Sequence, residues 1–396
     1  MILCVLLPRF GLAVAAGDRT ALLGEPVALA PAEGGAQAVG EISPAAEAVG
    51  VRAGMRLGEA LARCPRLTLV PADPIGVAEA WEHVLARLEG IGATVEAPRP
   101  GEAYFDSRGL RRLHGGHLDG VLAEVRRALT SGRAAGGARL GAGPVRFCAV
   151  AAAHVVRSRG HAVVAGADDL APLPVALLAR RAQTAELLPT LERLGMGTLG
   201  AVAALPRAAL GDRFGRAGLL AHDLASGHDT PLRPRPPGET LEETLDLPEA
   251  AGGQQLEQAL ALLIDRLLAR RERRGRTLRA AVLSARLVAG GTWRERMVFR
   301  EATADPTRIR LVARARLALL PAPAETLRLG AERLGPPPLE GGQLFEDGAA
   351  RRSARLREAV RQVRAAVGPE AALRVLPVDP GSRVPERHAV LTPFEP

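Results

Sequence analysis

The residues of this chain that could perform chemistry gather in one short segment, Glu96-Ala97-Pro98-Arg99-Pro100-Gly101-Glu102-Ala103-Tyr104-Phe105-Asp106. Three of its side chains are carboxylates: Glu96, Glu102 and Asp106. Two-metal phosphoryl transfer requires several carboxylates, because they neutralise two magnesium ions and fix them roughly 3.5 to 4 Å apart. A metal-dependent reaction would therefore be located in this segment, provided that another strand supplied further carboxylates.

The first strand of the chain supplies none. The apolar run Met1-Ile2-Leu3-Cys4-Val5-Leu6-Leu7 reads as a buried strand. It lacks a basic leader and stops at Pro8, so it is too short for a signal core or a membrane span. The first acidic residue of the chain is Asp18. Because Glu102 alone cannot hold two dications, we expect no resident metal and no cofactor.

The charge of the chain favours nucleic acid only modestly. Its 52 basic residues are all arginine, and the net charge is +9. Arginine suits phosphate because its planar fork donates two parallel hydrogen bonds, although a GC-rich genome would also replace lysine by arginine everywhere. The absence of lysine excludes a P-loop and a lysine Schiff base.

Cysteines and histidines indicate no metal site. Cys4, Cys64 and Cys148 are odd in number and far apart, which argues against a disulfide framework or a zinc cluster and implies a reducing cytoplasm. His114 and His117 are separated by two glycines, and nothing nearby completes a metal shell, so a turn is favoured.

The order of the predicted elements indicates a mixed α/β and α+β fold with several domains. A compact, Gly/Ala/Pro-rich segment follows the first strand, with helix starts near Ser43 and Leu57. An α/β pattern then resumes, and residues 170–225 read as short helices. The α/β part has predicted helices at 78–88 and 118–129 and strands at 93–97 and 103–106.

A stiff, Pro-rich run, Arg233 to Gly238, marks the best domain boundary. Beyond it we expect strand, helix, strand, strand, helix, strand, which is a split βαβ module. Asp305-Pro306 offers an N-cap for the second of these helices. The last segment, Leu373 to Pro396, is expected to be irregular.

The Glu96–Asp106 segment resembles the palm motif of the Y-family translesion polymerases, where a Ser-x-Asp-Glu-Ala-Tyr-x-Asp run holds catalytic magnesium. The family's Glu falls on Glu102 and its closing Asp on Asp106, but the metal-binding Asp position is Gly101. The family's first strand has a Val-Asp-x-Asp pattern. The two Asp positions of that pattern are Leu6 and Pro8 in this chain. Of the family's metal-ligand positions, which read Leu6, Gly101 and Glu102, only Glu102 is acidic.

The nucleotide pocket departs from the family in the same way. The family's aromatic sugar gate falls on Gly11, and its triphosphate-contacting Tyr and Arg fall on Pro44 and Glu47. An acidic side chain would repel a triphosphate. The combined losses resemble the ImuB type of this family, which is catalytically inactive.

Further motifs extend the resemblance over residues 1–240, and element order alone extends it over 241–345. Gly50–Met55 with Cys64-Pro65 resembles the fingers, whereas Leu170–Pro174 and Arg193–Gly200 resemble the thumb. The implied domains are the palm (1–10 and 76–166), fingers (11–75), helical thumb with a helix-hairpin-helix (167–232), linker (233–240), little finger (241–338) and C-terminal tail (339–396).

The resemblance implies a non-catalytic adaptor in SOS-type translesion synthesis and induced mutagenesis. Its implied partners are primer-template DNA, bound independently of sequence, the sliding clamp, a RecA-like accessory protein and an error-prone replicative polymerase. The implied location is the bacterial cytoplasm, at the nucleoid and not at a membrane. Two alternatives stay open: an active lesion-bypass polymerase that binds magnesium through Glu96, Glu102 and Asp106, and a structural helix-hairpin-helix DNA-binding protein.

Two segments could contact a DNA backbone. In the predicted hairpin between helices, Gly195, Gly197 and Thr198 would let backbone amides approach a phosphate, unless it is an ordinary turn. In the predicted strand Thr292 to Arg300, side chains alternate between two faces, so the arginines lie together on one face. This face could contact a DNA backbone, or it could be a basic surface that only contacts solvent. The arginines expected on that face are Arg294, Arg296 and Arg300, with Arg276, Arg279 and Arg286 of the partner strand.

The tail carries two possible protein-binding features. Gln343-Leu344-Phe345 resembles a sliding-clamp peptide, although Gly341 occupies the expected glutamine position and the run could instead anchor a loop. A predicted helix carries an apolar stripe that could dock a partner or pack on this protein itself. The stripe consists of Leu356, Val360, Val363 and Val367.

Overall fold

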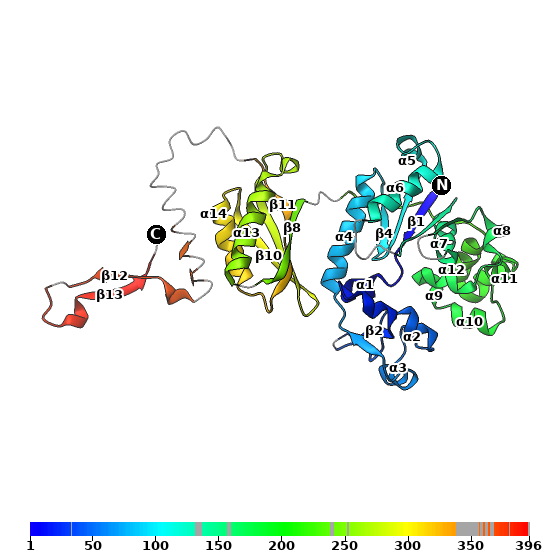
Figure 1. Cartoon of the computed structure of the whole chain (residues 1–396), viewed down its shortest axis with the longest axis horizontal. Coiled ribbons are helices and arrows are strands. Elements are labelled where there is room, and N and C mark those ends of the chain that lie inside the picture. The colour runs from blue at the N-terminus through cyan, green and yellow to red at the C-terminus, as the bar shows by residue number, and fades with distance from the viewer. Residues whose placement is uncertain are drawn as a thin grey trace. The chain divides into compact units, whose positions relative to one another are not determined.

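The chain divides into two compact units, Met1–Glu239 and Thr240–Pro396, which are described separately (Figure 1). The mixed α/β fold with several domains that the sequence predicts is confirmed. The structure is a computed structural model that describes residues 1–394 except 33, 131–136, 157–159, 238–240, 252, 338–355, 357–358, 361–362, 365–367 and 380.

A five-stranded sheet forms the centre of the first unit, in the order β4-β5-β1-β6-β7. The predicted first strand is confirmed as β1, and it lies in the middle because its apolar run can be buried on both faces. It pairs antiparallel with β5 and β6. The strands are β1 (Ile2–Leu6), β4 (Glu96–Arg99), β5 (Glu102–Asp106), β6 (Arg139–Gly143) and β7 (His161–Val163).

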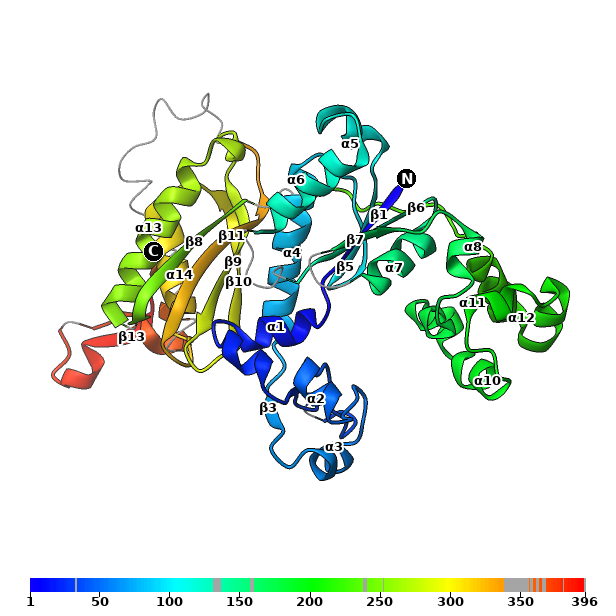
Figure 2. The ribbon, with the colours of Figure 1, turned by 45° about the vertical axis from the view of Figure 1, so that its right-hand side comes forward.

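Helices cover both faces of this sheet (Figure 2). On one face, α4 and α6 pack on Leu3, Val5 and Phe105. On the other, α7 approaches β6 so closely that a Cβ at Gly141 would lie 2.0 Å from the Ala149 carbonyl oxygen, so this position requires glycine. The helices are α4 (Pro74–Gly90), α5 (Arg108–Leu113), α6 (Leu118–Thr130) and α7 (Arg146–Val155).

A small subdomain is inserted between β1 and α4. Two short parallel strands, β2 and β3, carry its core, and the predicted helix start at Ser43 is confirmed by a side-chain hydrogen bond from Ala46 N to Ser43 Oγ at 3.2 Å. Its elements are α1 (Phe10–Ala16), a 3-10 turn (Thr20–Gly24), β2 (Val27–Leu29), α2 (Pro44–Ala48), α3 (Leu57–Arg63) and β3 (Thr68–Val70).

The predicted all-helical segment follows β7 and packs on the α7 side of the sheet. Its longest helix bends at Gly215, where φ is 60°. The elements are α8 (Ala167–Leu170), a 3-10 turn (Val175–Arg180), α9 (Ala182–Ala185), α10 (Leu188–Arg193), α11 (Leu199–Ala203) and α12 (Arg207–Ala225).

The second unit shows the predicted order of strand, helix, strand, strand, helix, strand. Its antiparallel sheet has the order β10-β9-β11-β8, and α13 and α14 cover one face. Asp305 caps α14, as predicted, by accepting a hydrogen bond from Thr307 N at 2.9 Å. The elements are β8 (Leu241–Ala251), α13 (Gly253–Ala269), a 3-10 turn (Arg271–Arg273), β9 (Leu278–Leu287), β10 (Thr292–Thr303), α14 (Pro306–Leu317) and β11 (Ala324–Leu334).

Two sequence-based expectations about strands are wrong. The strand predicted at 93–97 is β4 at Glu96–Arg99, because its pairing with β5 begins only at Glu96 opposite Tyr104. The segment Leu373 to Pro396 is not irregular, since β12 (Leu373–Pro377) pairs with β13 (Ala389–Pro393) as an antiparallel hairpin. Its prolines at 377 and 393 stand at strand ends, where they interrupt no ladder. Two 3-10 turns accompany this hairpin, Pro369–Ala371 and Pro385–Arg387.

Candidate functional site

Four residues form one row at one end of the strands of the first sheet. Register places Arg99 opposite Glu102, Glu102 opposite Leu6, and Leu6 opposite Arg139. Side chains that are directly opposite in a sheet point to the same face. The row therefore presents a guanidinium, a carboxylate, an apolar side chain and a second guanidinium on the face that α7 covers.

The Glu102 carboxylate is buried and bound by arginine. Its side chain is 4% exposed, and its Oε2 accepts hydrogen bonds from Arg99 Nε at 3.0 Å and Arg99 Nη2 at 2.7 Å. Arg180, at the end of the 3-10 turn that precedes α9, donates to the same oxygen. Two cations therefore occupy one oxygen of the carboxylate that the family resemblance assigned to metal.

Tyr104 binds the other oxygen of Glu102. Its hydroxyl donates to Glu102 Oε1 at 2.5 Å, and the Arg146 guanidinium lies 5.9 Å from the centre of its ring. Burial opposes ionisation of Glu102, but Arg180, Tyr104 and Arg99 together outweigh it and lower the pKa of this carboxyl. Burial, followed by the nearby Cys4 and Glu102, raises the pKa of Tyr104, so its hydroxyl stays a donor.

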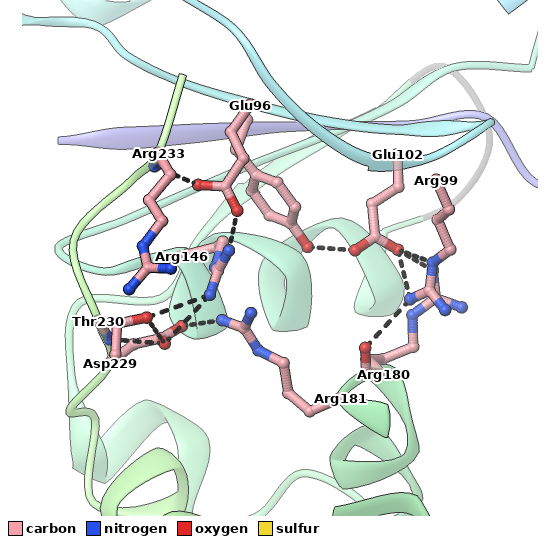
Figure 3. A network of polar contacts seen from close by, with 10 residues as sticks. Glu96, Arg99, Glu102, Arg146, Arg180, Arg181, Asp229, Thr230 and Arg233 are labelled. Atoms are coloured by element: carbon pink, nitrogen blue, oxygen red, sulfur yellow. Dashed lines mark hydrogen bonds and ion pairs between the residues drawn. The ribbon is translucent and has the colours of Figure 1, made fainter. Parts of the chain in front are cut away.

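A second set of charges continues this network along the sheet (Figure 3). Glu96 accepts hydrogen bonds from Arg146 and, at 2.6 Å, from the backbone N–H of Arg233. Asp229, whose side chain is 2% exposed, is bound by Arg181 and lies 3.6 Å from Arg146 Nη2. The three carboxylates of this network, Glu96, Glu102 and Asp229, are thus all held by arginine.

Asp106, the closing carboxylate of the segment, lies at the opposite end of β5 from Glu102. Its Oδ2 accepts a hydrogen bond from Arg108 Nε at 2.8 Å, and its Oδ1 lies 3.3 Å from the amino group of Met1. Although burial opposes it, these two cations lower the pKa of Asp106 to about 2.

The residues at the family's metal positions do not fit magnesium. Leu6 and Gly101 bring no oxygen from a side chain, and arginine and tyrosine hold both oxygens of Glu102. Among the residues that the structure describes, no group of three or more His, Cys, Asp or Glu is arranged to hold a metal ion. We therefore derive no reaction step through a metal at this position.

Gly101 also resists a carboxylate in its present conformation. Its φ is +84°, and an added Cβ would lie 2.9 Å from the Leu7 carbonyl oxygen and 3.1 Å from the Phe10 Cβ. The Leu7 N–H in turn donates to the Gly101 carbonyl at 2.8 Å. The turn between β4 and β5 thus requires glycine where the family carries a metal-binding Asp.

One position of the family's nucleotide pocket, Glu47, is in an ion pair. Arg9 donates to the Glu47 carboxylate at 2.5 Å and to the Ile42 carbonyl at 2.7 Å. Pro44 begins α2, and an added Cβ at Gly11 would lie 3.2 Å from the Glu41 carboxylate. None of the three positions, Gly11, Pro44 and Glu47, supplies an aromatic side chain or a cation to a triphosphate.

The predicted turn at the histidine pair is confirmed. Gly115 and Gly116 both have positive φ, and His114 Nε2 lies 3.1 Å from the Ile91 carbonyl oxygen. The side chain of His114 therefore contacts the protein backbone as part of this turn.

The predicted hairpin between helices is present as an exposed turn between α10 and α11. Gly195 has φ of +76°, and an added Cβ at either Gly195 or Gly197 would meet nothing within 4 Å. Thr198 caps α11 by accepting from Ala201 N at 3.3 Å. The turn is exposed, but the N–H groups of Gly195, Met196 and Gly197 already donate to backbone carbonyls, so in this conformation they are not open to a phosphate.

The predicted arginine face of the second unit is also present. In β10, Met297 and Phe299 are buried, whereas Arg294, Arg296 and Arg300 are exposed. Arg296 pairs with Glu332 of β11, with 2.6 Å between Nε and Oε2. Sequence alternation therefore found the right face, although one of its arginines already has a carboxylate partner.

The contribution expected from the partner strand needs correction. Arg286 lies opposite Thr292, on the same face as Arg294. Arg279 lies beside the irregular part of the β9 register, and its guanidinium donates to the Arg300 carbonyl of β10. Arg276 precedes β9 and bonds the Arg273 carbonyl at 3.3 Å. Of these three, Arg286 joins the arginine face by register, Arg279 contacts the β10 backbone at Arg300, and Arg276 lies before the strand.

The proposed clamp peptide, Gln343-Leu344-Phe345, lies outside the described residues. Of the apolar stripe that follows, Val367 also lies outside them, and the helical positions Leu356, Val360 and Val363 are described. Val360 is 8% exposed, whereas Leu356 and Val363 are 47% and 43% exposed. The stripe is therefore buried at one described position only.

Sequence reasoning missed Arg99, Arg139, Arg146, Arg180 and Asp229. The cross-strand position of Arg99, three residues before Glu102, could have been found from the Pro100-Gly101 turn. Arg180 and Asp229 carry no local signal, because they reach the sheet only through the packing of the helical segment.

The amino-terminal part of the chain is similar to known polymerases. Residues 5–167 match the model of the impB/mucB/samB family. The chain is 30% identical over 234 residues to DNA polymerase IV of Moorella thermoacetica, covering 57% of each protein. It is 30% identical over 224 residues to DNA polymerase IV of Escherichia fergusonii, covering 56% of this chain and 66% of that protein.

Two solved structures also match the chain, at lower identity. The crystal structure of DinB from Sulfolobus solfataricus is 17% identical, with a TM-score of 0.45 over 85% of this chain and 99% of that chain. An insertion ternary complex of Dbh DNA polymerase is 16% identical, with a TM-score of 0.46 over 85% of this chain and 98% of that chain. The chain spans about three fifths of the length of the curated relatives it matches, and by sequence its residues 5–167 are similar to the impB/mucB/samB family.

Proposed function

We propose that this protein is a Y-family polymerase homologue of the ImuB type, which binds primer-template DNA without catalysing nucleotide transfer. The observation that carries this proposal is the state of Glu102. Arg99 and Arg180 bind one of its oxygens and Tyr104 the other, while Leu6 and Gly101 bring no side-chain oxygen. Two-metal catalysis needs several free carboxylates around both ions, and this sheet offers none.

DNA binding in this proposal rests on groups that meet a backbone without reading sequence. Arg294 and Arg300 extend from β10 into solvent, and the turn Gly195–Thr198 is exposed, although its Gly195, Met196 and Gly197 amides would have to leave their backbone partners to meet a phosphate. Such contacts give affinity that falls as salt rises and depends little on the base sequence. The similarity of the chain to proteins named DNA polymerase IV supports the same ligand.

In this proposal the protein acts as an adaptor in SOS-type translesion synthesis. Its tail would recruit the sliding clamp through Gln343-Leu344-Phe345, together with a RecA-like accessory protein and an error-prone replicative polymerase. A pull-down with clamp and polymerase, repeated with Leu344→Ala and Phe345→Ala, tests the clamp contact. Retention of the clamp by the double variant would remove this part of the proposal.

The competing function is an active lesion-bypass polymerase, which the names of the curated relatives favour. It would have to free Glu102 from Arg99 and Arg180 and bring Glu96 and Asp106 beside it. These two carboxylates are bound by Arg146 and Arg108. Primer extension with magnesium or manganese discriminates between the two functions.

We expect no extension above background with either metal, while a fluorescent primer-template still binds. Robust extension that disappears in Glu102→Ala would overturn the proposal in favour of the polymerase. Failure to bind primer-template DNA at low salt would overturn both functions.

A further inference from the structure

The buried charges of the sheet do not balance. The carboxylates Glu96, Glu102 and Asp229 are accompanied by five arginine side chains (Figure 3). These are Arg99, Arg139, Arg146, Arg180 and Arg181. Arg99 and Arg180 bond Glu102, and Arg139 lies in the same row two strands away. The site therefore carries an excess of positive charge at the position where the family resemblance would place magnesium ions.

The guanidinium groups also keep unused donors. Among the described residues, no acceptor meets the buried Nε of Arg139, Arg146 or Arg180. Buried donors without partners cost about 1–3 kcal/mol each, so an acceptor is expected to satisfy such groups. The arrangement therefore calls for an anion.

The arginines lie between Glu102 and solvent. The side chains of Arg99 and Arg180 are 42% and 27% exposed, whereas that of Glu102 is 4% exposed. An approaching ligand would therefore meet guanidinium before it meets carboxylate. Planar guanidinium forks donate paired hydrogen bonds to the oxygens of a phosphate.

We propose that Arg99, Arg139 and Arg180 form a phosphate-binding site that holds a backbone phosphate of the bound DNA directly, without a metal ion. The site rests on the proposed function, because it assumes that DNA is the ligand of this chain. Glu102 keeps the guanidinium groups together and partly neutralised, so the phosphate replaces part of its interaction with them. The arginines thus take over the charge that the family supplies with magnesium.

Neutral backbone linkages test this site. Binding of primer-template DNA is measured by fluorescence anisotropy with single methylphosphonate linkages placed along each strand. For the wild-type chain, a methylphosphonate at one linkage, or at either of two adjacent linkages, is expected to weaken DNA binding by about tenfold. This factor corresponds to the free energy of about one hydrogen bond to a charged group. In Arg99→Gln with Arg180→Gln, the same linkages are expected to cost little, and the salt slope is expected to fall by about one.

Two further variants separate a binding defect from a folding defect. Glu102→Gln keeps a partner for Tyr104 and removes the competing negative charge, so its affinity for DNA is expected to rise several-fold at low salt. A merely destabilised protein would not gain affinity. Arg63→Gln is the matched control, because Arg63 is an exposed arginine of α3 that pairs with Glu59 at 3.0 Å, outside the site.

The inference fails if the double variant shows the wild-type pattern of sensitive linkages, or if Glu102→Gln does not bind DNA more tightly. It also fails if pyrophosphate or a deoxynucleoside triphosphate, titrated by calorimetry, binds this site while every DNA linkage is insensitive. Absence of DNA binding by the wild-type chain would instead refute the proposed function.

Discussion

Adding a methyl group at Gly101 tests whether the metal-ligand position is closed by the backbone itself. Gly101→Ala places a Cβ 2.9 Å from the Leu7 carbonyl oxygen in a residue with φ of +84°. Gly54→Ala is the matched control, since Gly54 has φ of +82° and an added Cβ there meets nothing within 4 Å. The left-handed conformation costs an L-residue about 1–2 kcal/mol at either site. Overpacking adds about 1–3 kcal/mol at Gly101 only.

Urea denaturation of the first unit measures this difference. Trp81 is buried and packs edge-on against Phe10 with 5.5 Å between ring centroids, so its fluorescence reports on the region that the new Cβ enters. The only other tryptophan is Trp293, which is replaced by Phe in both variants. Gly101→Ala is expected to lose about 1–3 kcal/mol more than Gly54→Ala. Equal losses would refute the claim that this turn excludes a side chain, and Gly101→Asp would then become a plausible restored ligand.

Three further predictions concern other parts of the chain. Because the pKa of Asp106 is lowered from 3.8 to about 2, its ionised form stabilises the fold above about pH 3.8, and this contribution is lost as pH falls to about 2; acid denaturation of Asp106→Asn should lack that component. Burial raises the pKa of Cys4 and raises that of Cys148 to about 11, so neither thiol should react with iodoacetamide in the folded protein, and rapid labelling of either would contradict the structure. Asp305→Ala removes the cap of α14 and should cost the second unit about 1 kcal/mol in urea, followed by Trp293 fluorescence in a Trp81→Phe background, whereas an unchanged midpoint would show that the cap contributes nothing.

Local sequence patterns were sufficient for most elements. The continuous apolar run of β1 predicts a strand buried on both faces, and the alternation in β10 predicts which side chains are exposed. The pairs Ser43-Pro44 and Asp305-Pro306 mark helix starts because the cap and the following proline act within one turn. These signals depend on residues a few positions apart.

Features that depend on partners far along the chain could not be predicted. Strand β4 begins later than its β-branched residues suggest, because β5 determines where pairing starts. The terminal hairpin of β12 and β13 joins segments that each look too rich in proline. The same reason hides the network of Glu96, Glu102 and Asp229, whose arginines come from β4, α7 and the helical segment.

Glu102 is the one family carboxylate that remains among the metal positions, and its contacts explain its presence without a metal. Removing it would leave Arg99 and Arg180 as neighbouring cations without the carboxylate that binds both, which is costly. Leu6, its neighbour in register, is 5% exposed and packs in the core that joins the sheet to the helical segment. A carboxylate at position 6 would be buried beside Glu102 as a second like charge, while the arginines already bind the first. Restoring metal binding would therefore require the loss of Arg99 and Arg180 as well as new ligands at positions 6 and 101, so a single reversion is expected to leave the site inactive.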